Sequence, residues 1–224
     1  RALGLNDPKR SWHSDRSPIL RIVDWQGRVM AALAHLGYAL LGLTNSDTQE
    51  LALGVTGASS TMPQKQNPVS PSALVALNHQ HGGLRATLQA ASAHQHQRDG
   101  GAWFAEWLAL PQICLGTASA LQHAKRLSAG ITPHPLQMHH ALEAGLGLIH
   151  AEALSFALAE KMPRCEAQRV TKALCLDALD KRVPLADLAR ADYPDLPPDL
   201  FRAEAQLGQA PADALAFATR ADHI

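Results

Sequence analysis

The sequence lacks net charge and long apolar runs, and both absences narrow the class of protein. Its 20 Lys and Arg residues balance 20 Asp and Glu residues over a length of 224. No bulk electrostatic field therefore recruits nucleic acid or an anionic membrane, so any anion binding has to be local. The sequence also contains no run of about 18 or more apolar residues, and we therefore expect no membrane-spanning helix.

Cysteine is scarce as well, because the chain has only three of these residues, Cys114, Cys165 and Cys175. An odd number in helical surroundings indicates small core or surface residues of a reduced, cytoplasmic protein rather than a disulfide framework. No secretory leader is visible, and the first residue is Arg1 rather than an initiator Met. We therefore expect a processed or truncated chain.

The hydrophobic pattern predicts an all-α fold. After Pro18, apolar residues recur at three- and four-residue steps, at Ile19, Ile22, Val23, Val29, Met30, Leu33, Leu36, Leu40 and Leu43. This spacing predicts an amphipathic helix of roughly 26 residues, about 39 Å long, a length typical of helical bundles. No segment alternates with a period of two, so we expect almost no sheet.

The same reasoning predicts six further helices and two domains. The helices are expected over 69–93, 102–129, 134–161, 165–180, 184–191 and 198–206. Ile131-Thr132-Pro133 interrupts the pattern with a capping residue and a helix starter. The expected domains are therefore part of a long-helix bundle over 1–131 and a small helical C-terminal domain over 132–224.

One stretch, 57–68, has a composition that packing does not explain. It carries two serines, a threonine, a lysine and an asparagine between Ser59 and Asn67, with Pro63 and Pro68 stiffening the chain. Hydroxyl, ammonium and carboxamide groups on a loop between two helices are suited to holding a charged anion. Functional side chains commonly lie on such loops of a rigid scaffold. The alternative is a surface loop with polar residues placed by chance.

The stretch also contains a long motif, Ala58-Ser-Ser-Thr-Met-Pro-Gln-Lys-Gln-Asn-Pro68. It resembles the Gly-Ser-Ser-x-Met-Pro-x-Lys-x-Asn-Pro signature of the fumarase/aspartase superfamily, with Ala58 as a departure. The resemblance implies addition or removal of a group across a C–C bond next to a carboxylate. It assigns the proton transfer to Ser59. It places Lys65 and Asn67 against a substrate carboxylate, with Ser60, Thr61 and Met62 completing the anion-binding loop.

A second region, Gln97-Arg-Asp-Gly-Gly-Ala-Trp-Phe-Ala-Glu-Trp107, narrows the resemblance. It is similar to a Glu-Arg-x-x-Gly-x-Trp-x-x-Glu-Trp segment of bacterial 3-carboxy-cis,cis-muconate cycloisomerases. Trp12-His-Ser-Asp-Arg16 is similar to the segment before their long helix. Arg98 and Arg16 are therefore candidates for further carboxylate contacts. The alternatives are solvated side chains, ion pairs between subunits and, for the tryptophans, ordinary packing.

The resemblance implies a cycloisomerase that converts 3-carboxy-cis,cis-muconate to 4-carboxymuconolactone in the β-ketoadipate pathway of aromatic catabolism. It further implies a polycarboxylate substrate, no metal or organic cofactor, and a cytoplasmic homotetramer whose subunits share active sites. Gln64 and Gln66 depart from the His and Arg that many cycloisomerases carry, and the superfamily's catalytic histidine is expected upstream of Pro18. An adenylosuccinate- or argininosuccinate-type lyase and a non-catalytic helical oligomerisation fragment remain as alternatives.

The twelve histidines give little support for a metal site. Their clusters, at 79/81, 94/96 and 139/140, have spacings of one or two residues, which point in different directions on a helix. The sequence therefore predicts no metal centre.

Overall fold

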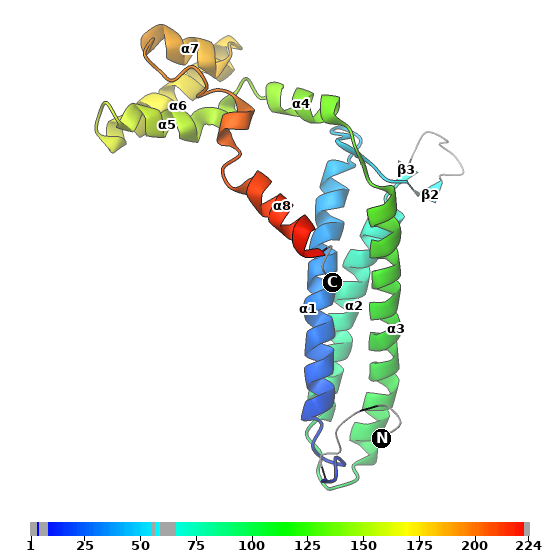
Figure 1. The fold of residues 1–224 in the computed structure, drawn as a ribbon. Helices are drawn as coiled ribbons and strands as arrows, with labels where there is room; N and C mark the ends of the chain where they lie inside the picture. The colour runs from blue at the N-terminus through cyan, green and yellow to red at the C-terminus, as the bar shows by residue number, and fades with distance from the viewer. Residues whose placement is uncertain (1–3, 5–8, 55–56, 59–65, 222–224) are drawn as a thin grey trace. The chain divides into compact units, whose positions relative to one another are not determined.

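The computed structural model describes residues 4, 9–54, 57–58 and 66–221, and the chain divides into two compact units, 1–134 and 135–224. The described part is almost entirely helical, which confirms the predicted all-α fold (Figure 1).

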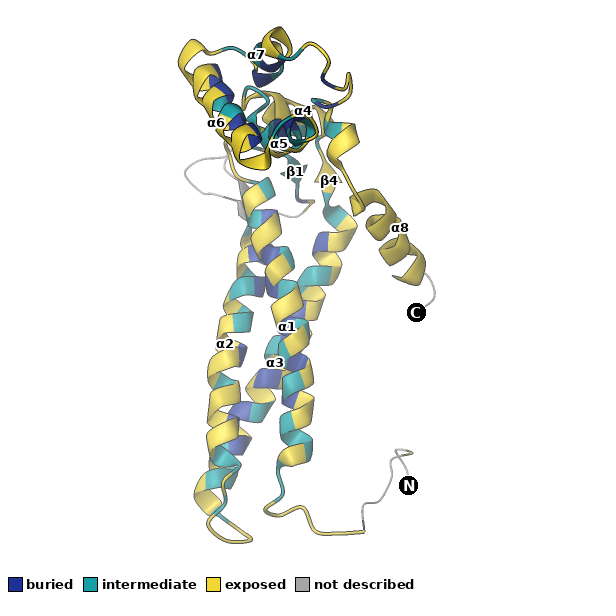
Figure 2. Ribbon diagram, turned by 90° about the vertical axis from the view of Figure 1, so that its left-hand side faces the viewer, coloured by how far each residue is buried: buried dark blue, intermediate teal, exposed yellow. Residues whose placement is uncertain are grey.

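The first unit consists of three long helices that pack side by side, with consecutive helices running in opposite directions (Figure 1). They are α1 (Ser17–Leu43), α2 (Val69–Ala91) and α3 (Gly100–Gly130). Their buried residues face the shared core, as Figure 2 shows by colour. The largest fully buried side chains of this core are Met30, Leu74, Ile113, Val23 and Pro71. The three predicted long helices are therefore confirmed.

Local signals explain where these helices begin. Pro18 lies in the first turn of α1, where a missing backbone N–H removes no helical hydrogen bond. At the start of α3, the Asp99 carboxylate accepts a hydrogen bond from the Ala102 amide at 3.2 Å. This N-cap lets α3 begin at Gly100, two residues before the predicted start, even though two glycines open the helix.

Short antiparallel ribbons are the only sheet structure among the described residues. β1 (Leu51–Ala52) pairs with β4 (Thr132–Pro133), and β2 (Gly57–Ala58) pairs with β3 (Gln66–Asn67). Each strand has two residues, so the prediction of almost no sheet is confirmed.

The second unit is a cluster of shorter helices. They are α4 (Pro135–Glu143), η1 (Leu148–His150), α5 (Ala151–Ala159), α6 (Arg164–Lys181), α7 (Leu185–Asp192), η2 (Ala203–Gln206) and α8 (Ala210–Ala221). Leu154, Leu158 and Leu185 are fully buried at its core. The predicted helices 165–180 and 184–191 match α6 and α7 to within a residue or two.

The prediction of one continuous helix over 134–161 is wrong. Helical structure stops after Glu143 and resumes only at Leu148. Between them, Leu146 and Gly147 both adopt left-handed backbone conformations, with φ of 53° and 71°. A left-handed residue cannot continue a right-handed helix, and apolar periodicity does not reveal it.

The tail beyond Asp192 also differs from expectation. The predicted helix 198–206 is reduced to the short 3₁₀ helix η2, preceded by turns. By contrast, α8 was not predicted, although its sequence contains Pro211 near its start. This proline is the second residue of α8, where proline is well tolerated. Along its described length, α8 has no buried residue, so no packed core marks it in the sequence.

Among the described helices, no single one is long and apolar enough to cross a membrane. Only α4 taken together with Leu148–Ala159, a pair bent by 72°, meets that criterion of length and composition.

Candidate functional site

The motif stretch 57–68 leaves and re-enters the described structure through one ribbon. In this β2–β3 ribbon, Gly57 pairs with Asn67 and Ala58 pairs with Gln66. The chain therefore enters the motif and leaves it at neighbouring points, next to the start of α2 (Figure 1). The predicted residues Ser59, Ser60, Thr61, Met62 and Lys65 lie outside the described residues.

Asn67 is the one predicted motif residue that the structure describes. It lines an open hollow of about 450 Å³ at the start of α2, together with Pro68, Val69, Ser72, Ala73 and Ala76. The first turn of α2 contains no acidic residue. Its amides and the positive end of the helix dipole therefore meet no carboxylate from that turn. This surface is compatible with an anion beside Asn67.

The start of α2 is held against α3 by a side-chain hydrogen bond. Ser70 Oγ and His123 Nδ1 lie 3.1 Å apart, and the contact is partly buried. Two residues further along, the Ser72 hydroxyl donates to the Pro68 carbonyl at 2.9 Å. Both contacts fix the backbone that carries Asn67.

The segment before the motif is anchored to the end of α3. The β1–β4 ribbon joins the two, and the His134 amide donates to the Glu50 carbonyl at 2.9 Å. A Cβ on Gly54 would lie 2.9 Å from Gly130 Cα, so the two backbones approach more closely than any side chain allows. The chain is therefore fixed on both sides of the motif, by the contact of Gly54 with Gly130 before it and by the pairing of Asn67 with Gly57 at its end.

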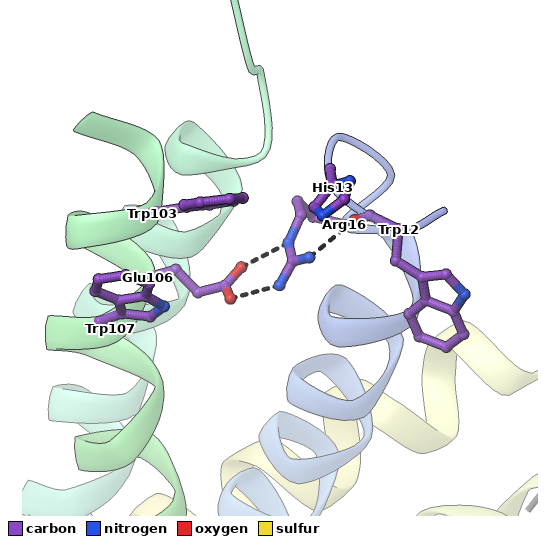
Figure 3. Close-up of a pocket in the computed structure, with 6 residues that line it drawn as sticks. All are labelled: Trp12, His13, Arg16, Trp103, Glu106 and Trp107. Carbon is purple, nitrogen blue, oxygen red and sulfur yellow. Dashed lines mark hydrogen bonds and ion pairs between the residues drawn. The ribbon is translucent and has the colours of Figure 1, made fainter. Parts of the chain in front are cut away.

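The second predicted region forms a different pocket, shown in Figure 3. It has a volume of about 280 Å³ and is lined by Trp12, His13, Arg16, Trp103, Glu106 and Trp107. Trp103 and Trp107 stack with ring centroids 6.1 Å apart, and the His13 ring lies 6.1 Å from Trp103. The segments 12–16 and 97–107, which both resemble segments of one subfamily, therefore contact each other in the fold.

At the centre of this pocket, Arg16 and Glu106 form a bidentate ion pair (Figure 3). Arg16 Nε donates to one carboxylate oxygen of Glu106 at 2.8 Å, and Nη2 donates to the other at 2.5 Å. Arg16 Nη1 donates to the Trp12 carbonyl at 3.0 Å. The side chains are only 16% and 10% exposed. The Arg16 charge is therefore already matched within the chain, and its contact with a substrate carboxylate stays a prediction.

Sequence reasoning did not identify Glu106 as the partner of Arg16. Ninety residues separate the two positions, and no local pattern predicts such a contact. The available signal was that both residues belong to the two motifs that resemble one subfamily. Arg98, the other predicted contact, is exposed next to the helix cap. The adjoining Asp99 accepts backbone hydrogen bonds from Gln95 and Ala102, which lower the pKa of its carboxyl.

The residues predicted to bind the substrate lie in two separate places in this chain. Arg16 and Arg98 lie at the end of the bundle where α1 and α3 begin, whereas Asn67 lies at the opposite end (Figure 1). The 23 residues of α2 span about 34 Å between the two ends. One small ligand cannot contact Asn67 and either arginine of the same chain.

No metal centre emerges from the described part of the chain. Within it, no group of three or more His, Cys, Asp and Glu side chains is placed to hold a metal ion.

Comparison with known proteins gives relatives for this arrangement, although no model of a protein family matches the chain. The 3-carboxy-cis,cis-muconate cycloisomerase of Pseudomonas aeruginosa is 36% identical over 183 residues, 80% of this chain and 40% of that protein. The protein of the same name from Acinetobacter baylyi is 31% identical over 216 residues, 92% of this chain and 48% of that protein. N-acetyl-S-(2-succino)cysteine lyase of Dickeya dadantii is 27% identical, over 80% of this chain and 40% of that protein.

Solved structures give the same answer for the fold. The 3-carboxy-cis,cis-muconate lactonizing enzyme of Pseudomonas putida superposes with a TM-score of 0.80 at 29% identity, covering 93% of this chain and 48% of that one. A fumarate lyase of Mesorhizobium gives 0.81 at 26% identity, with 94% and 48% covered. The chain thus spans about half the length of these relatives. By sequence and fold it belongs to the fumarase/aspartase, or fumarate lyase, superfamily, and its relatives include 3-carboxy-cis,cis-muconate cycloisomerases.

Proposed function

We propose that the full-length protein is a 3-carboxy-cis,cis-muconate cycloisomerase, which forms 4-carboxymuconolactone by proton transfer next to a carboxylate. One observation carries the proposal. The curated relatives that are more than 30% identical over most of this chain include several proteins bearing this name. The ten-residue motif and the paired Trp–Glu–Trp and Trp–His–Arg regions support the same assignment.

In the proposed reaction, a substrate carboxylate adds to a double-bond carbon, and Ser59 donates a proton to the neighbouring carbon; in the reverse reaction Ser59 removes that proton as a base. A serine hydroxyl is a poor base alone, and it needs nearby donors and a cation to stabilise its charged form. Ser59 follows Ala58 directly, and Lys65 precedes Gln66, so both are bonded to the last residue pair of the β2–β3 ribbon. That connection supports assigning the motif's Ser59 and Lys65 to a single site.

Asn67 is proposed to bind a substrate carboxylate with its side-chain amide. Its place beside the first turn of α2 supports this role, because that turn carries no acidic side chain and lies at the positive end of the helix dipole. Ser60, Thr61 and Met62 complete the proposed binding loop. No cofactor is needed in this mechanism.

We propose a cytoplasmic homotetramer, and the separation of the two predicted regions supports active sites that are shared between subunits. Because about 34 Å divides Asn67 from Arg98 and Arg16, a single chain cannot supply both to one ligand. The bundle also exposes large apolar side chains on α1 and α3, among them Ile22, Trp25, Phe104, Leu108 and Leu115. Several large apolar side chains exposed on the same helices are typical of a protein interface.

A parallel ultraviolet assay on 3-carboxymuconate, adenylosuccinate and argininosuccinate tests the proposal with the full-length protein. We expect turnover of 3-carboxymuconate alone. In Ser59→Ala, removing the proton-transfer group should lower kcat by about 10²- to 10⁴-fold without changing the oligomer mass. The matched control is Ser46→Ala, at an exposed serine outside the motif, which should keep the parental rate. A Ser59→Ala protein with the parental rate would remove Ser59 from the mechanism.

A lyase that cleaves a succinyl adduct is the second candidate, because one relative bears the name N-acetyl-S-(2-succino)cysteine lyase. Adding that compound to the panel distinguishes the two reactions. Turnover only of a succinyl adduct would replace the cycloisomerase assignment. No turnover of any substrate by a correctly assembled full-length protein would favour a non-catalytic helical oligomerisation module.

A further inference from the structure

The second unit contains a pocket that neither the motif nor the proposed reaction uses. It has a volume of about 480 Å³, which falls within the range of small-molecule sites. Its walls come from segments far apart in the sequence, namely His139, Leu142, Glu143, Leu146, Gly147, His150, Pro184, Ala186, Phe201, Arg202, Ala203 and Glu204. We call it the His150 pocket.

The backbone around the His150 pocket is held in an unusual conformation. Leu146 and Gly147 are both left-handed, and only glycine adopts that conformation without strain. The Leu185 amide donates to the Leu146 carbonyl at 2.9 Å, which ties the start of α7 to this turn. Strained positions that the surrounding structure maintains are enriched at binding sites. The wall of the pocket is therefore fixed rather than loosely folded.

The acidic side chains of the His150 pocket each lie next to a basic one. His139 Nε2 lies 3.1 Å from a carboxylate oxygen of Glu143, and Arg202 Nε lies 3.6 Å from one of Glu204. Each pair consists of one basic and one acidic group on the rim. His139 is charged only when it is protonated, so the rim offers no uncompensated positive charge to an anionic ligand.

His150 is the polar group of this pocket whose hydrogen bonding is incomplete. The residue is only 9% exposed, and its Nδ1 atom is buried without a partner among the described residues. The Phe201 ring stands edge-on to the imidazole, with centroids 6.0 Å apart and planes at 89°. Cδ2 of the imidazole faces Gly147, another lining residue, so a half-turn of the ring would bring Nδ1 to that side. An unpaired buried polar atom is costly, and a ligand that satisfies it gains that energy.

We propose that the His150 pocket binds a small neutral hydroxyaromatic molecule, with its ring against Leu142, Leu146 and Phe201 and its hydroxyl on His150. The mostly apolar wall favours the ring, and the rim, whose one arginine is paired with Glu204, favours a neutral group over an anion. A neutral imidazole has one donor and one acceptor nitrogen, and a hydroxyl can complement either. A carbonyl or an ammonium group would complement only one of them.

Three probes with the same ring system test the proposal on the full chain: 2-naphthol, naphthalene and 2-naphthoate. Binding is measured by equilibrium dialysis. All four tryptophans lie in the first unit, so tryptophan fluorescence is not a suitable readout. We expect 2-naphthol to bind about tenfold tighter than naphthalene, the value of roughly one hydrogen bond, and 2-naphthoate to bind more weakly than 2-naphthol.

Two variants locate the site, and a third serves as a control. His150→Phe keeps an aromatic ring next to Phe201 but removes the hydrogen bond, so 2-naphthol should lose its advantage while naphthalene still binds. Ala186→Trp fills the pocket and should abolish binding of all three probes. His140→Phe makes the same substitution at an exposed position of α4 outside the lining and should change nothing. Circular dichroism checks that each variant is folded.

Several results would overturn the proposal. These are equal binding of 2-naphthol and naphthalene to the parental chain, tighter binding of 2-naphthoate, or no binding of 2-naphthol at millimolar concentration. Undiminished binding to a folded Ala186→Trp protein would place the site elsewhere. If His150→Phe does not fold, the ¹⁵N signals of the His150 ring in the parental chain decide the matter. They should shift on adding 2-naphthol but not on adding naphthalene, and equal responses would refute the hydrogen bond.

Discussion

The ion pair between Arg16 and Glu106 gives the sharpest stability prediction. Replacing Glu106 by Leu leaves the Arg16 guanidinium enclosed between α1 and α3 without its counter-ion. The two side chains are 16% and 10% exposed, so solvent screens this charge poorly. Breaking a buried pair by removing one partner costs about 3–5 kcal/mol, and the partial exposure places this one near the lower end of that range. We therefore expect Glu106→Leu to lose about 3 kcal/mol.

Urea unfolding, followed by circular dichroism at one fixed protomer concentration, measures this loss. With a slope of about 2 kcal/mol per molar urea, a loss of 3 kcal/mol lowers the midpoint by about 1.5 M. The double variant Arg16→Met with Glu106→Leu removes both charges at once. It should recover most of the lost stability, because no unpaired charge then remains in the helix interface.

An exposed ion pair in the same bundle provides the control. Arg85 Nε lies 2.6 Å from Asp24 Oδ1, a contact as short as those of Arg16, but the side chains are 53% and 42% exposed. Asp24→Asn should therefore cost no more than about 1 kcal/mol. A cost for Asp24→Asn that equals that of Glu106→Leu, or a double variant no more stable than the single one, would refute the argument from burial.

Two further predictions concern the same bundle. Burial, with a smaller effect of Arg85 and against an opposing effect of Asp24, lowers the pKa of His81 from its usual value of about 6.5. As the pH falls, the His81 imidazole is therefore protonated in the unfolded chain before it is protonated in the folded chain, and the free energy of unfolding should fall below about pH 6.5. His81→Leu should reduce this pH dependence, which is measured as the urea midpoint between about pH 7.5 and 5. An equal pH dependence of the urea midpoint in the parental and His81→Leu proteins would contradict this prediction. Gly54→Ala places a Cβ 2.9 Å from the Gly130 backbone and should cost about 1–3 kcal/mol in thermal unfolding. In the control variant Gly82→Ala, the new Cβ meets no described atom within 4 Å, and alanine should stabilise α2 by up to about 1 kcal/mol. A similar loss of stability in Gly54→Ala and Gly82→Ala would refute the steric explanation.

The sequence by itself determined the long helices and the composition of the motif. The apolar stripe from Ile19 to Leu43 predicted α1 almost to its ends, because helical periodicity is a local property that recurs every three or four residues. The start of α3 was predicted two residues late, because the Asp99 cap was not recognised. The all-α class followed from this periodicity, and the superfamily from the motif at 58–68.

The helix predictions were wrong where the backbone conformation of a single residue ends a helix that the apolar periodicity would continue. The left-handed Leu146 divides a segment whose apolar spacing is helical on both sides. Proline was likewise ambiguous, because Pro211 lies in a first helical turn rather than after a last one. Composition does not distinguish these alternatives, since the same residue type stands in both.

Only the tertiary structure decided which residues meet. Arg16 and Glu106 are 90 positions apart, and their contact depends on the packing of α1 against α3. Gly54 and Gly130 show a close approach whose reason is invisible until β1 pairs with β4. The long helices also set Asn67 and Arg16 at opposite ends of the bundle. Contacts distant in sequence arise from how rigid elements pack, and so the sequence could name the chemical groups but not place them together.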